Sequence, residues 1–534
     1  MLVKTHGAAV QGIDAITVTI EVSARKGVGF SLVGMADTAV KESYQRVVTA
    51  LTQSGFTWPR CNMVVNLAPA DVRKEGAAYD LPIALCALVA SEQVRCSRPI
   101  ERFMIMGELS LDGTVLPIRG ALPMAIKARE MGFQGMIVPA QNADEAAVVN
   151  NLEVYGVSSL IDVVRFFSGE LDIAPTVVNT REEFARASGV FDFDFSEVKG
   201  QESVKRALEV ACAGGHNILL VGPPGSGKSM MAKRLPTILP PLSLSEALET
   251  TKIHSVAGKL KGGARLMTSR PFRSPHHTIS PVALVGGGSN PMPGEISLAH
   301  NGVLFLDEFP EFSRMVLEVM RQPLEDRHIS ISRARYAIDY PAGFMLVASM
   351  NPCPCGYYNH PTRECQCPPG AVQRYLNRIS GPLLDRIDLQ VEIFPVPFES
   401  LASQHPAEPS EAIRARVIAA RAVQTARFAE EKGVYCNAQM NRRMLERHAA
   451  LDVECAEVLR QTMTRLDMSA RAYDRILKVA RTIADLDYSQ RPGITPEEAA
   501  AMPVSRMHLN EALAYRSLDR GNWGATITKT FTSK

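Results

Sequence analysis

A glycine-rich segment between an apolar run and a helical run could bind the phosphates of a nucleotide. The segment has the pattern G-x-x-x-x-G-K-S from Gly222 to Ser229, and residues 218–221 before it are all apolar. Glycines let backbone N–H groups curl around phosphates where a helix begins. Lys228 would then reach the β- and γ-phosphates, and Ser229 would hold Mg²⁺. The other members of this predicted ATP site are Gly222, Pro223, Pro224, Gly225, Ser226 and Gly227.

Two further apolar runs end in polar side chains suited to hydrolysis. GVLFLDE ends in Asp307 and Glu308, and FMLVASM is followed by Asn351. The carboxyl ends of parallel strands share one edge of a sheet, and ligands bind there. We expect Asp307 to orient Mg²⁺-bound water, Glu308 to act as general base, and Asn351 to position the attacking water. The alternatives are two solvated acids at a strand end and an ordinary turn asparagine.

Four of the ten cysteines lie in one loop directly after Asn351. They form two C-x-C pairs separated by nine residues. The loop is rich in Pro and Gly and cannot bury much apolar surface, so Zn²⁺ held by four thiolates would supply folding energy. Unligated thiols and a redox role remain as alternatives. The candidate ligands are Cys353, Cys355, Cys365 and Cys367, with His360 as a possible substitute for one of them.

Length and composition restrict the class of protein. A chain of 534 residues predicts two to four domains, and 46% hydrophobic with 21% charged residues is ordinary for a globular protein. The sequence has neither the apolar region of a signal peptide nor a membrane-spanning run, so we expect a cytoplasmic protein with reduced thiols and no membrane partner. The net charge is +2, so any DNA-binding surface would have to be a local basic stripe.

The elements that must position these residues fall into three regions. The first alternates short β-rich runs with helical runs, which predicts an α+β domain. The second alternates strands, helices and Gly-rich loops, which predicts a parallel-sheet α/β domain. The third is helical. The predicted boundaries are residues 1–170, a linker at 171–190, 191–397 with a Cys-rich insertion at 353–367, 398–520, and a tail at 521–534.

Four motifs together resemble a known family of ATPases. GPPGSGKS, GVLFLDEFPEF, ASMNPCPCG and GPLLDRIDL occur in this order, as in AAA+ ATPases related to magnesium chelatase. The stretch RPFRSPHHTISPVALVGGGSNPMPGEISLAHNGVLFLDE is typical of the bacterial ComM/YifB family, and the resemblance covers nearly the whole chain. It implies a P-loop NTPase core with a helical lid. It also implies a homo-hexameric motor that uses ATP and Mg²⁺ to drive branch migration.

The same resemblance assigns a substrate and several residue roles. The expected partners are single-stranded and branched DNA and recombination proteins, during homologous recombination and natural transformation. Lys228 and Ser229 match the Walker A motif, and Asp307 and Glu308 match Walker B. The remaining matches are Asn351 as sensor 1, Arg386 as the arginine finger and Arg471 as sensor 2.

Residues 1–170 resemble the Lon protease fold, which is ribosomal S5 domain 2-like. Peptide cleavage by that fold needs a Ser nucleophile activated by a Lys. The matching positions here are Ala78 and Pro123, and neither can fill these roles. We therefore expect a catalytically inactive domain that serves as a scaffold or a DNA-binding ring. Its polar residues Lys74, Glu75 and Asp80 are expected to be structural.

Basic residues in two segments could attract DNA phosphates. The first segment, between the Walker motifs, has cations among glycines and small residues, and the second has arginines near a predicted hairpin tip. A solvated basic face is the alternative. The adjacent His276 and His277 are expected to have a structural role in a loop rather than to bind metal. The predicted DNA contacts are Lys259, Lys261, Arg265, Arg333 and Arg335, with Arg270 and Arg273 as further mobile cations.

Two other functions compete with the DNA motor. One is a chelatase-type ATPase that remodels a protein or a complex inserting metal into a tetrapyrrole. The resemblance of residues 1–170 to Lon opposes this function, because the chelatase motor subunit lacks such a domain. The other is an ATP-dependent protease, which Ala78 opposes.

Overall fold

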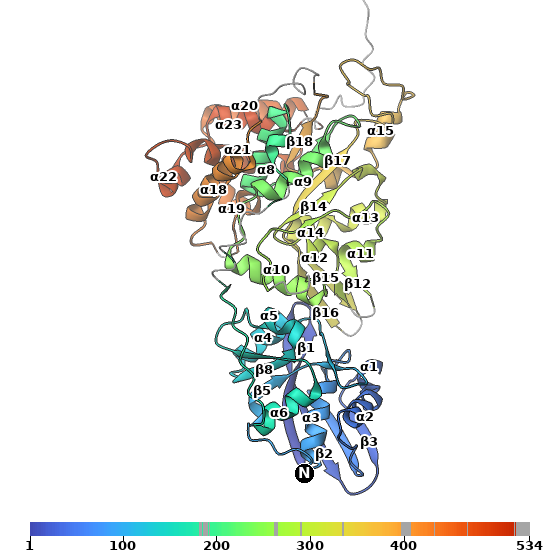
Figure 1. Cartoon of the computed structure of the whole chain (residues 1–534). Coiled ribbons are helices and arrows are strands. Elements are labelled where there is room, and N and C mark those ends of the chain that lie inside the picture. The colour runs from blue at the N-terminus through green and yellow to red at the C-terminus, as the bar shows by residue number, and fades with distance from the viewer. Residues whose placement is uncertain are drawn as a thin grey trace, which may run out of the picture.

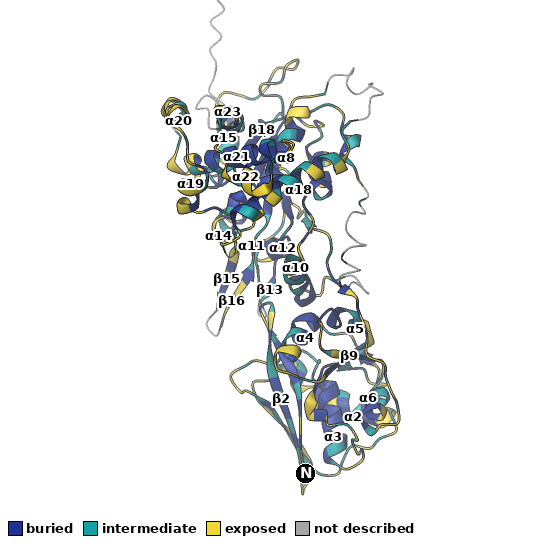
Figure 2. Cartoon of the chain, turned by 90° about the vertical axis from the view of Figure 1, so that its left-hand side faces the viewer, coloured by how far each residue is buried: buried dark blue, intermediate teal, exposed yellow. Residues whose placement is uncertain are grey.

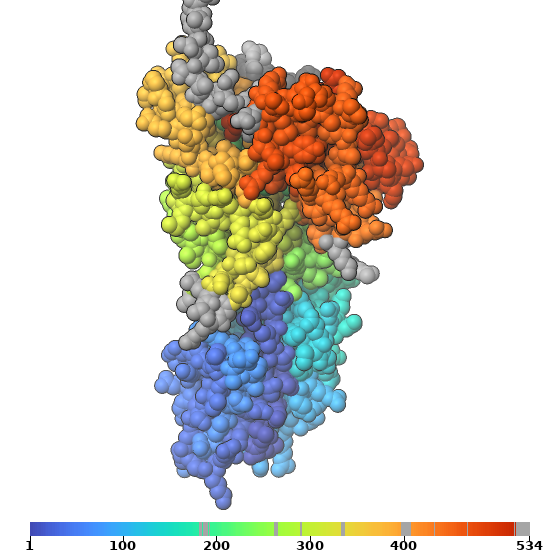
Figure 3. Space-filling model, turned by 180° about the vertical axis from the view of Figure 1, so that it is seen from behind, coloured from blue at the N-terminus to red at the C-terminus, as the bar shows by residue number. Residues whose placement is uncertain are grey.

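The computed structural model describes residues 1–180, 184, 191, 193–260, 265–288, 291–333, 336–396, 407–431, 433–466, 468–516 and 518. It consists of an N-terminal domain, a central domain and a C-terminal helical domain, with the first two stacked end to end (Figures 1 and 3). The predicted order of an α+β region, a parallel α/β region and a helical region is confirmed. Lys261, Arg335 and the predicted tail lie outside the described residues.

The N-terminal domain contains a seven-stranded mixed sheet in the order β3-β4-β2-β1-β5-β8-β9. Its long antiparallel pair β1–β2 reaches from the far end of the domain to the central domain (Figure 1). Helix α3 is almost entirely buried, as its apolar sequence DLPIALCALVA predicts. The strands are β1 (Leu2–Gln11), β2 (Asp14–Arg25), β3 (Gly29–Val33), β4 (Asn62–Ala68), β5 (Phe103–Ile105), β6 (Glu108–Leu109), β7 (Val115–Leu116), β8 (Gly135–Pro139) and β9 (Glu153–Val157). The helices are α1 (Thr38–Lys41), α2 (Ser43–Gln53), α3 (Asp80–Ala90), α4 (Ala121–Glu130), α5 (Ala140–Ala146) and α6 (Leu160–Ser168).

The central domain is built on a five-stranded, fully parallel sheet in the order β11-β14-β17-β10-β18. Strands β10, β14 and β17 are buried along their whole length, because helices cover both faces of the sheet. All three apolar runs predicted as strands therefore end at one edge. The strands are β10 (Ile218–Val221), β11 (Phe272–Arg273), β14 (Val303–Leu306), β17 (Met345–Met350) and β18 (Leu389–Glu392), with hairpins β12 (Gly286–Gly287)–β13 (Met292–Pro293) and β15 (His328–Arg333)–β16 (Tyr336–Pro341). The helices are α8 (Glu202–Gly214), α9 (Lys228–Ile238), α10 (Leu244–Val256), α11 (Pro281–Val285), α12 (Glu295–Leu298), α13 (Arg314–Val319), α14 (Arg321–Asp326), α15 (Ala371–Leu376) and α16 (Gly381–Leu384).

The helical domain packs on α8 of the central domain and shares its hydrophobic core (Figure 2). A buried acid joins its two long helices, because Asp485 of α21 accepts hydrogen bonds from Arg427 of α18 and Arg481 of α21. The Arg427 and Asp485 side chains are 1% and 0% exposed, so this charge pair is fully removed from water. The helices are α18 (Ser410–Arg427), α19 (Arg442–His448), α20 (Val453–Leu466), α21 (Ala470–Tyr488), α22 (Pro496–Ala501) and α23 (Arg506–Ala514). Among the described helices, none is both long and apolar enough to cross a lipid bilayer.

Polar contacts join the N-terminal and central domains. Ser255 of α10 donates a hydrogen bond to buried Glu145 of α5, and Lys252 pairs with Asp14 at 2.8 Å. The first half of the predicted linker also packs on the N-terminal domain: the Thr176 N–H donates to Val154 O, and Val178 is buried.

Candidate functional site

The predicted phosphate-binding loop connects β10 to α9 at the carboxyl edge of the sheet. Gly225 and Gly227 have φ values of +76° and +88°, a left-handed conformation that favours glycine. A Cβ at either position would meet no heavy atom within 4 Å, so backbone conformation rather than crowding selects glycine. Ser226 Oγ is buried and has no hydrogen-bond partner among the described atoms. A buried hydroxyl normally has a partner, so this one is free to donate to a phosphate oxygen of a bound nucleotide.

Lys228 points back over this loop. Its ammonium donates to the carbonyl oxygens of Gly222 and Pro223 at 2.7 and 2.8 Å and to Asn351 Oδ1 at 3.3 Å. Burial lowers the pKa of Lys228 to about 8, although the nearby Asp307 carboxylate acts in the opposite direction. The structure thus brings together the predicted phosphate cation and the predicted water-positioning amide, which lie 123 positions apart in the chain.

Ser229 and Asp307 form the second predicted contact. Ser229 Oγ donates to Asp307 Oδ2 at 2.6 Å. Mg²⁺ prefers oxygen ligands and commonly uses one or two protein groups besides phosphates and water, so this hydroxyl–carboxylate pair fits the ion. Sequence reasoning missed Ser349, whose hydroxyl donates to the other oxygen, Asp307 Oδ1, and fixes the carboxylate. Its place near the end of β17, beside β14, is the signal that could have identified it.

Glu308 extends from the same strand end in a different direction. It adopts a left-handed conformation with φ of +55°, and its N–H donates to Asp307 Oδ1 at 3.1 Å. Its side chain is more than half exposed, and Oε2 lies 3.5 Å from His277 Nδ1. His277 lies shortly after the end of β11, and Glu308 lies shortly after the end of β14. The two strands are parallel neighbours in the sheet, with Arg273 of β11 opposite Leu304 of β14. His277, expected to be structural, therefore contacts the candidate base.

The predicted arginines occupy different environments. Arg386 is buried, pairs with Glu325 of its own chain and donates to Pro382 O at 2.7 Å. The acid two positions further on, Asp388, pairs with Arg475 instead. Arg471 is exposed near the start of α21. That helix start lies beside the Arg386 segment, because Ser469 Oγ lies 3.4 Å from Asp385 Oδ2.

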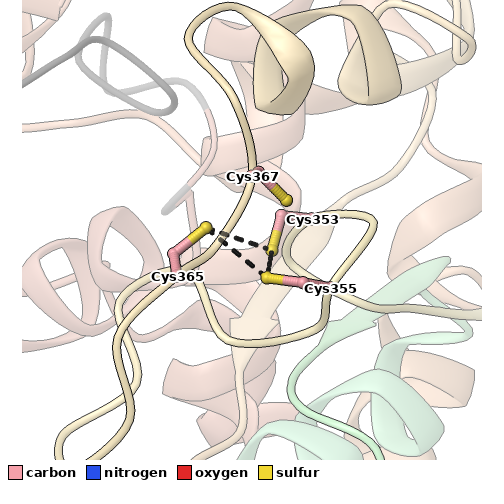
Figure 4. Close-up of side chains that lie close together, drawn as sticks. All are labelled: Cys353, Cys355, Cys365 and Cys367. Atoms are coloured by element: carbon pink, nitrogen blue, oxygen red, sulfur yellow. Dashed lines mark hydrogen bonds between the residues drawn. The ribbon is translucent and has the colours of Figure 1, made fainter.

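The four cysteines of the insertion come together (Figure 4). Their Sγ atoms all lie within 4.8 Å of one another. Cys353 Sγ lies 3.2 Å from that of Cys355 and 3.7 Å from that of Cys365, so the thiols are in contact but form no disulfide. His360, the substitute ligand, instead accepts hydrogen bonds from the backbone of Thr362 and Arg363. The cluster is therefore built of thiols alone.

Two of the predicted mobile cations are fixed in place, which corrects the sequence prediction. Arg270 is held by Glu246 and by the carbonyl oxygens of Pro240 and Asn301, and burial lowers its pKa. Arg273 forms a two-pronged pair with Glu295 at 2.6 and 2.7 Å. Both guanidinium groups are therefore engaged by acids of the same domain and are not the mobile cations that the sequence predicted.

The other predicted DNA contacts differ in exposure. Lys259 is exposed, whereas Arg265 pairs with Asp144 of the N-terminal domain at 3.3 Å. Arg333 ends β15, and only its backbone is described. Ile338 of this hairpin lies against the β1–β2 turn, where a Cβ on Gly12 would be 3.1 Å from it.

The polar residues of the N-terminal domain have structural partners. Asp80 is buried and paired with Arg46 at 2.6 Å, and burial raises its pKa to about 6. Lys74 is buried and donates to Pro69 O. Ala78 contributes a backbone carbonyl that accepts from the Gly107 N–H, and Pro123 is buried in α4. No nucleophile–base pair is formed by the residues at these positions.

Comparison with known proteins places all three domains in one family. Residues 194–401 match the family described as "Magnesium chelatase, subunit ChlI", residues 20–142 match "Subunit ChlI of Mg-chelatase", and residues 407–516 match "Magnesium chelatase, subunit ChlI C-terminal". The chain is 43% identical over 524 residues to the uncharacterized protein YifB of Salmonella typhimurium, covering 97% of this chain and 98% of that one.

Two further relatives extend the comparison. The chain is 42% identical over 521 residues to competence protein ComM of Haemophilus influenzae, with 97% and 98% of the two chains covered. It is also 30% identical over 157 residues to Lon protease 2 of Bacillus subtilis, which covers 27% of each chain. Two relatives match over nearly their whole length, and the nucleotide-site residues occupy one sheet edge. The chain therefore belongs to the ComM/YifB family of magnesium chelatase-like AAA+ ATPases.

Proposed function

We propose that this protein is a hexameric, ATP-driven DNA motor that moves the branch point of branched DNA during homologous recombination and natural transformation. The observation that carries the proposal is the 42% identity to competence protein ComM over 97% of the chain. It is supported by a nucleotide site whose parts come from three strands and meet at one edge. Recombination proteins are the expected partners.

Each side chain of the candidate nucleotide site has a role in the proposed reaction. Lys228 would hold the β- and γ-phosphates, and Ser229 with Asp307 would hold Mg²⁺, which neutralises phosphate charge. Glu308 would accept the proton of the attacking water, and Asn351, already beside Lys228, would orient that water. His277 would hold the Glu308 carboxylate between turnovers.

Arg386 would act on the nucleotide of a neighbouring protomer. A cation stabilises the transferring phosphoryl group only where it reaches that group, and a head-to-tail ring supplies such a contact at each interface. Within one chain Arg386 is bound to Glu325, so assembly would exchange this partner for phosphate. Arg471 would contact nucleotide as sensor 2.

Mixing two inactive variants tests the role in trans. Rings that contain both Lys228→Ala and Arg386→Ala protomers have some interfaces at which both side chains are intact, so ATPase activity is expected to reappear. Mass photometry checks that mixed hexamers form. Mixed hexamers without ATPase activity would refute the role in trans.

The cysteine cluster would hold a structural Zn²⁺. Four sulfurs at about 2.3 Å from a tetrahedral ion lie about 3.8 Å apart, and the separations of 3.2, 3.7 and 3.6 Å among Cys353, Cys355 and Cys365 are close to that spacing. Zinc content per protomer, measured on protein purified in metal-free buffer, tests this role. If the purified protein contains no metal and still binds nucleotide with the same affinity, the structural Zn²⁺ is refuted. The four cysteines would then be unligated thiols or have a redox role.

DNA would bind through local basic groups rather than through net charge. Lys259 is exposed, and Arg333 is the last residue of strand β15 in the β15–β16 hairpin. Phosphate contacts of this kind are independent of sequence and weaken with salt. Lys261 and Arg335 belong to the same proposal.

A labelled four-way junction distinguishes the proposed motor from the competing functions. Incubation with protein, ATP and Mg²⁺ is expected to convert the junction to duplex products, and Glu308→Gln serves as the matched control that binds ATP without turnover. Absence of conversion, together with an ATPase rate that DNA does not change, would refute the proposal. ATP-dependent stimulation of metal insertion into a tetrapyrrole would then favour the chelatase-type function.

A further inference from the structure

The loop between the two cysteine pairs lies directly against the phosphate-binding loop. Gly356, next to Cys355, is buried with φ of +82°, and a Cβ there would lie only 2.6 Å from Pro224 Cδ. On the other side, Cys353 follows Asn351 by two positions. The cluster is thus connected to the nucleotide site by chain continuity and by a van der Waals contact.

The same loop lines a hollow beside that site. Residues 358–361 form one wall, Gly222 and Pro223 at the start of the phosphate-binding loop form another, and residues 392–395 at the end of β18 form a third. A change in the position of residues 358–361 therefore changes the surroundings of the phosphate-binding loop.

The loop has little buried surface and no regular secondary structure to hold its shape. Between residues 354 and 370, all of which are described, Gly356 is the only buried residue, and there is no helix or strand. Some of its side-chain contacts are internal to the loop, such as the hydrogen bond that Arg363 donates to the Tyr357 hydroxyl at 2.8 Å. A segment with so little buried surface cannot offset its conformational entropy without a cross-link.

We propose that metal bound by the four thiols fixes residues 356–361 as a wall of the nucleotide site, so that metal occupancy sets nucleotide affinity. This inference rests on the proposed Zn²⁺ and ATP sites and is independent of DNA binding. The metal joins two ends of the loop into a closed ring, and ordering a binding loop in advance increases affinity. Loss of metal would release the wall and weaken binding of ADP and ATP.

Reversible metal removal from the wild-type protein tests the coupling. Zinc content is measured by mass spectrometry, and the affinity for fluorescent ADP with Mg²⁺ is measured before chelation, after it and after zinc chloride is restored. We expect affinity to fall about tenfold or more on zinc removal and to recover on its return. Cys355→Ser with Cys365→Ser should show the same loss permanently. Cys61→Ser with Cys96→Ser, two partly buried thiols of the N-terminal domain, provides the matched control.

A pair of glycine variants tests the contact without removing a thiol. Gly356→Ala places its methyl group against Pro224, whereas Gly370→Ala, at a similar φ of +76°, meets no atom within 4 Å. Both substitutions place a Cβ on a residue with positive φ, which costs a similar amount of free energy at the two positions. The difference in ADP affinity between the two variants therefore reports the contact with Pro224. We expect both variants to retain zinc and only Gly356→Ala to bind ADP more weakly.

The outcomes separate this inference from the proposed function. Wild-type protein without zinc, or zinc-bound protein whose ADP affinity is unchanged by chelation, would refute the coupling. Equal ADP affinity of the two glycine variants would also refute it. If zinc removal weakens ADP binding but the protein does not convert DNA junctions, this inference holds and the proposed motor function is refuted.

Discussion

Raising the pH from 7 to 9 is expected to weaken nucleotide binding by about tenfold through Lys228. Burial lowers the pKa of this ammonium to about 8 from an ordinary value of 10.5. Phosphate binds the charged form, so the observed affinity follows the fraction of protein in which Lys228 carries its proton. That fraction is about nine-tenths at pH 7 and about one-tenth at pH 9, hence the factor of ten.

The sign of the effect follows from which form the ligand stabilises. The pKa of Lys228 is lowered in the free protein, and bound phosphates raise it again, so binding takes up a proton above pH 8 and becomes weaker as pH rises. A lysine that kept its ordinary pKa would be protonated at both pH values and would give no change.

Titration of fluorescent ADP with Mg²⁺ across this pH range measures the effect. Lys228→Arg is the matched control, because its guanidinium stays charged throughout. This variant retains Lys478, whose pKa is also lowered to about 8 by burial, so any contribution from that group persists in the control. A flat wild-type profile, or an equal slope in Lys228→Arg, would refute the assignment.

Three further outcomes follow from the contacts. Glu308→Gln should bind ATP with unchanged affinity and hydrolyse it roughly a hundredfold more slowly, measured by phosphate release, and wild-type turnover would rule out Glu308 as the base. Asp485→Ala leaves two buried arginines without their acid and should lower the free energy of unfolding by about 3–5 kcal/mol in a urea titration, whereas a change under about 1 kcal/mol would show that the network is not essential. Arg333→Ala with Arg335→Ala should reduce the slope of log affinity for DNA against log salt by about two, and an unchanged slope would place both arginines away from DNA.

Local sequence patterns were sufficient to predict the strand, loop and helix that carry the candidate nucleotide site, and the order of the α+β, parallel α/β and helical regions. The run at residues 218–221 and the glycines at 225 and 227 specify a strand, a loop and a helix start within a few positions. Asp307 and Asn351 each follow an apolar run, and a parallel sheet necessarily places such strand ends at one edge. These features depend on periodicity and backbone conformation, which neighbouring residues determine.

Side-chain pairing was decided only by the tertiary structure. Arg270 resembles a mobile cation in the sequence, but its acid, Glu246, lies on α10 and becomes its partner only when that helix packs beside it. Likewise, only the pairing of β11 with β14 brings His277 to Glu308. The sequence shows which side chains are charged and can therefore form an ion pair. It does not show the partner, because the partner is set by the packing of elements that are distant in the chain.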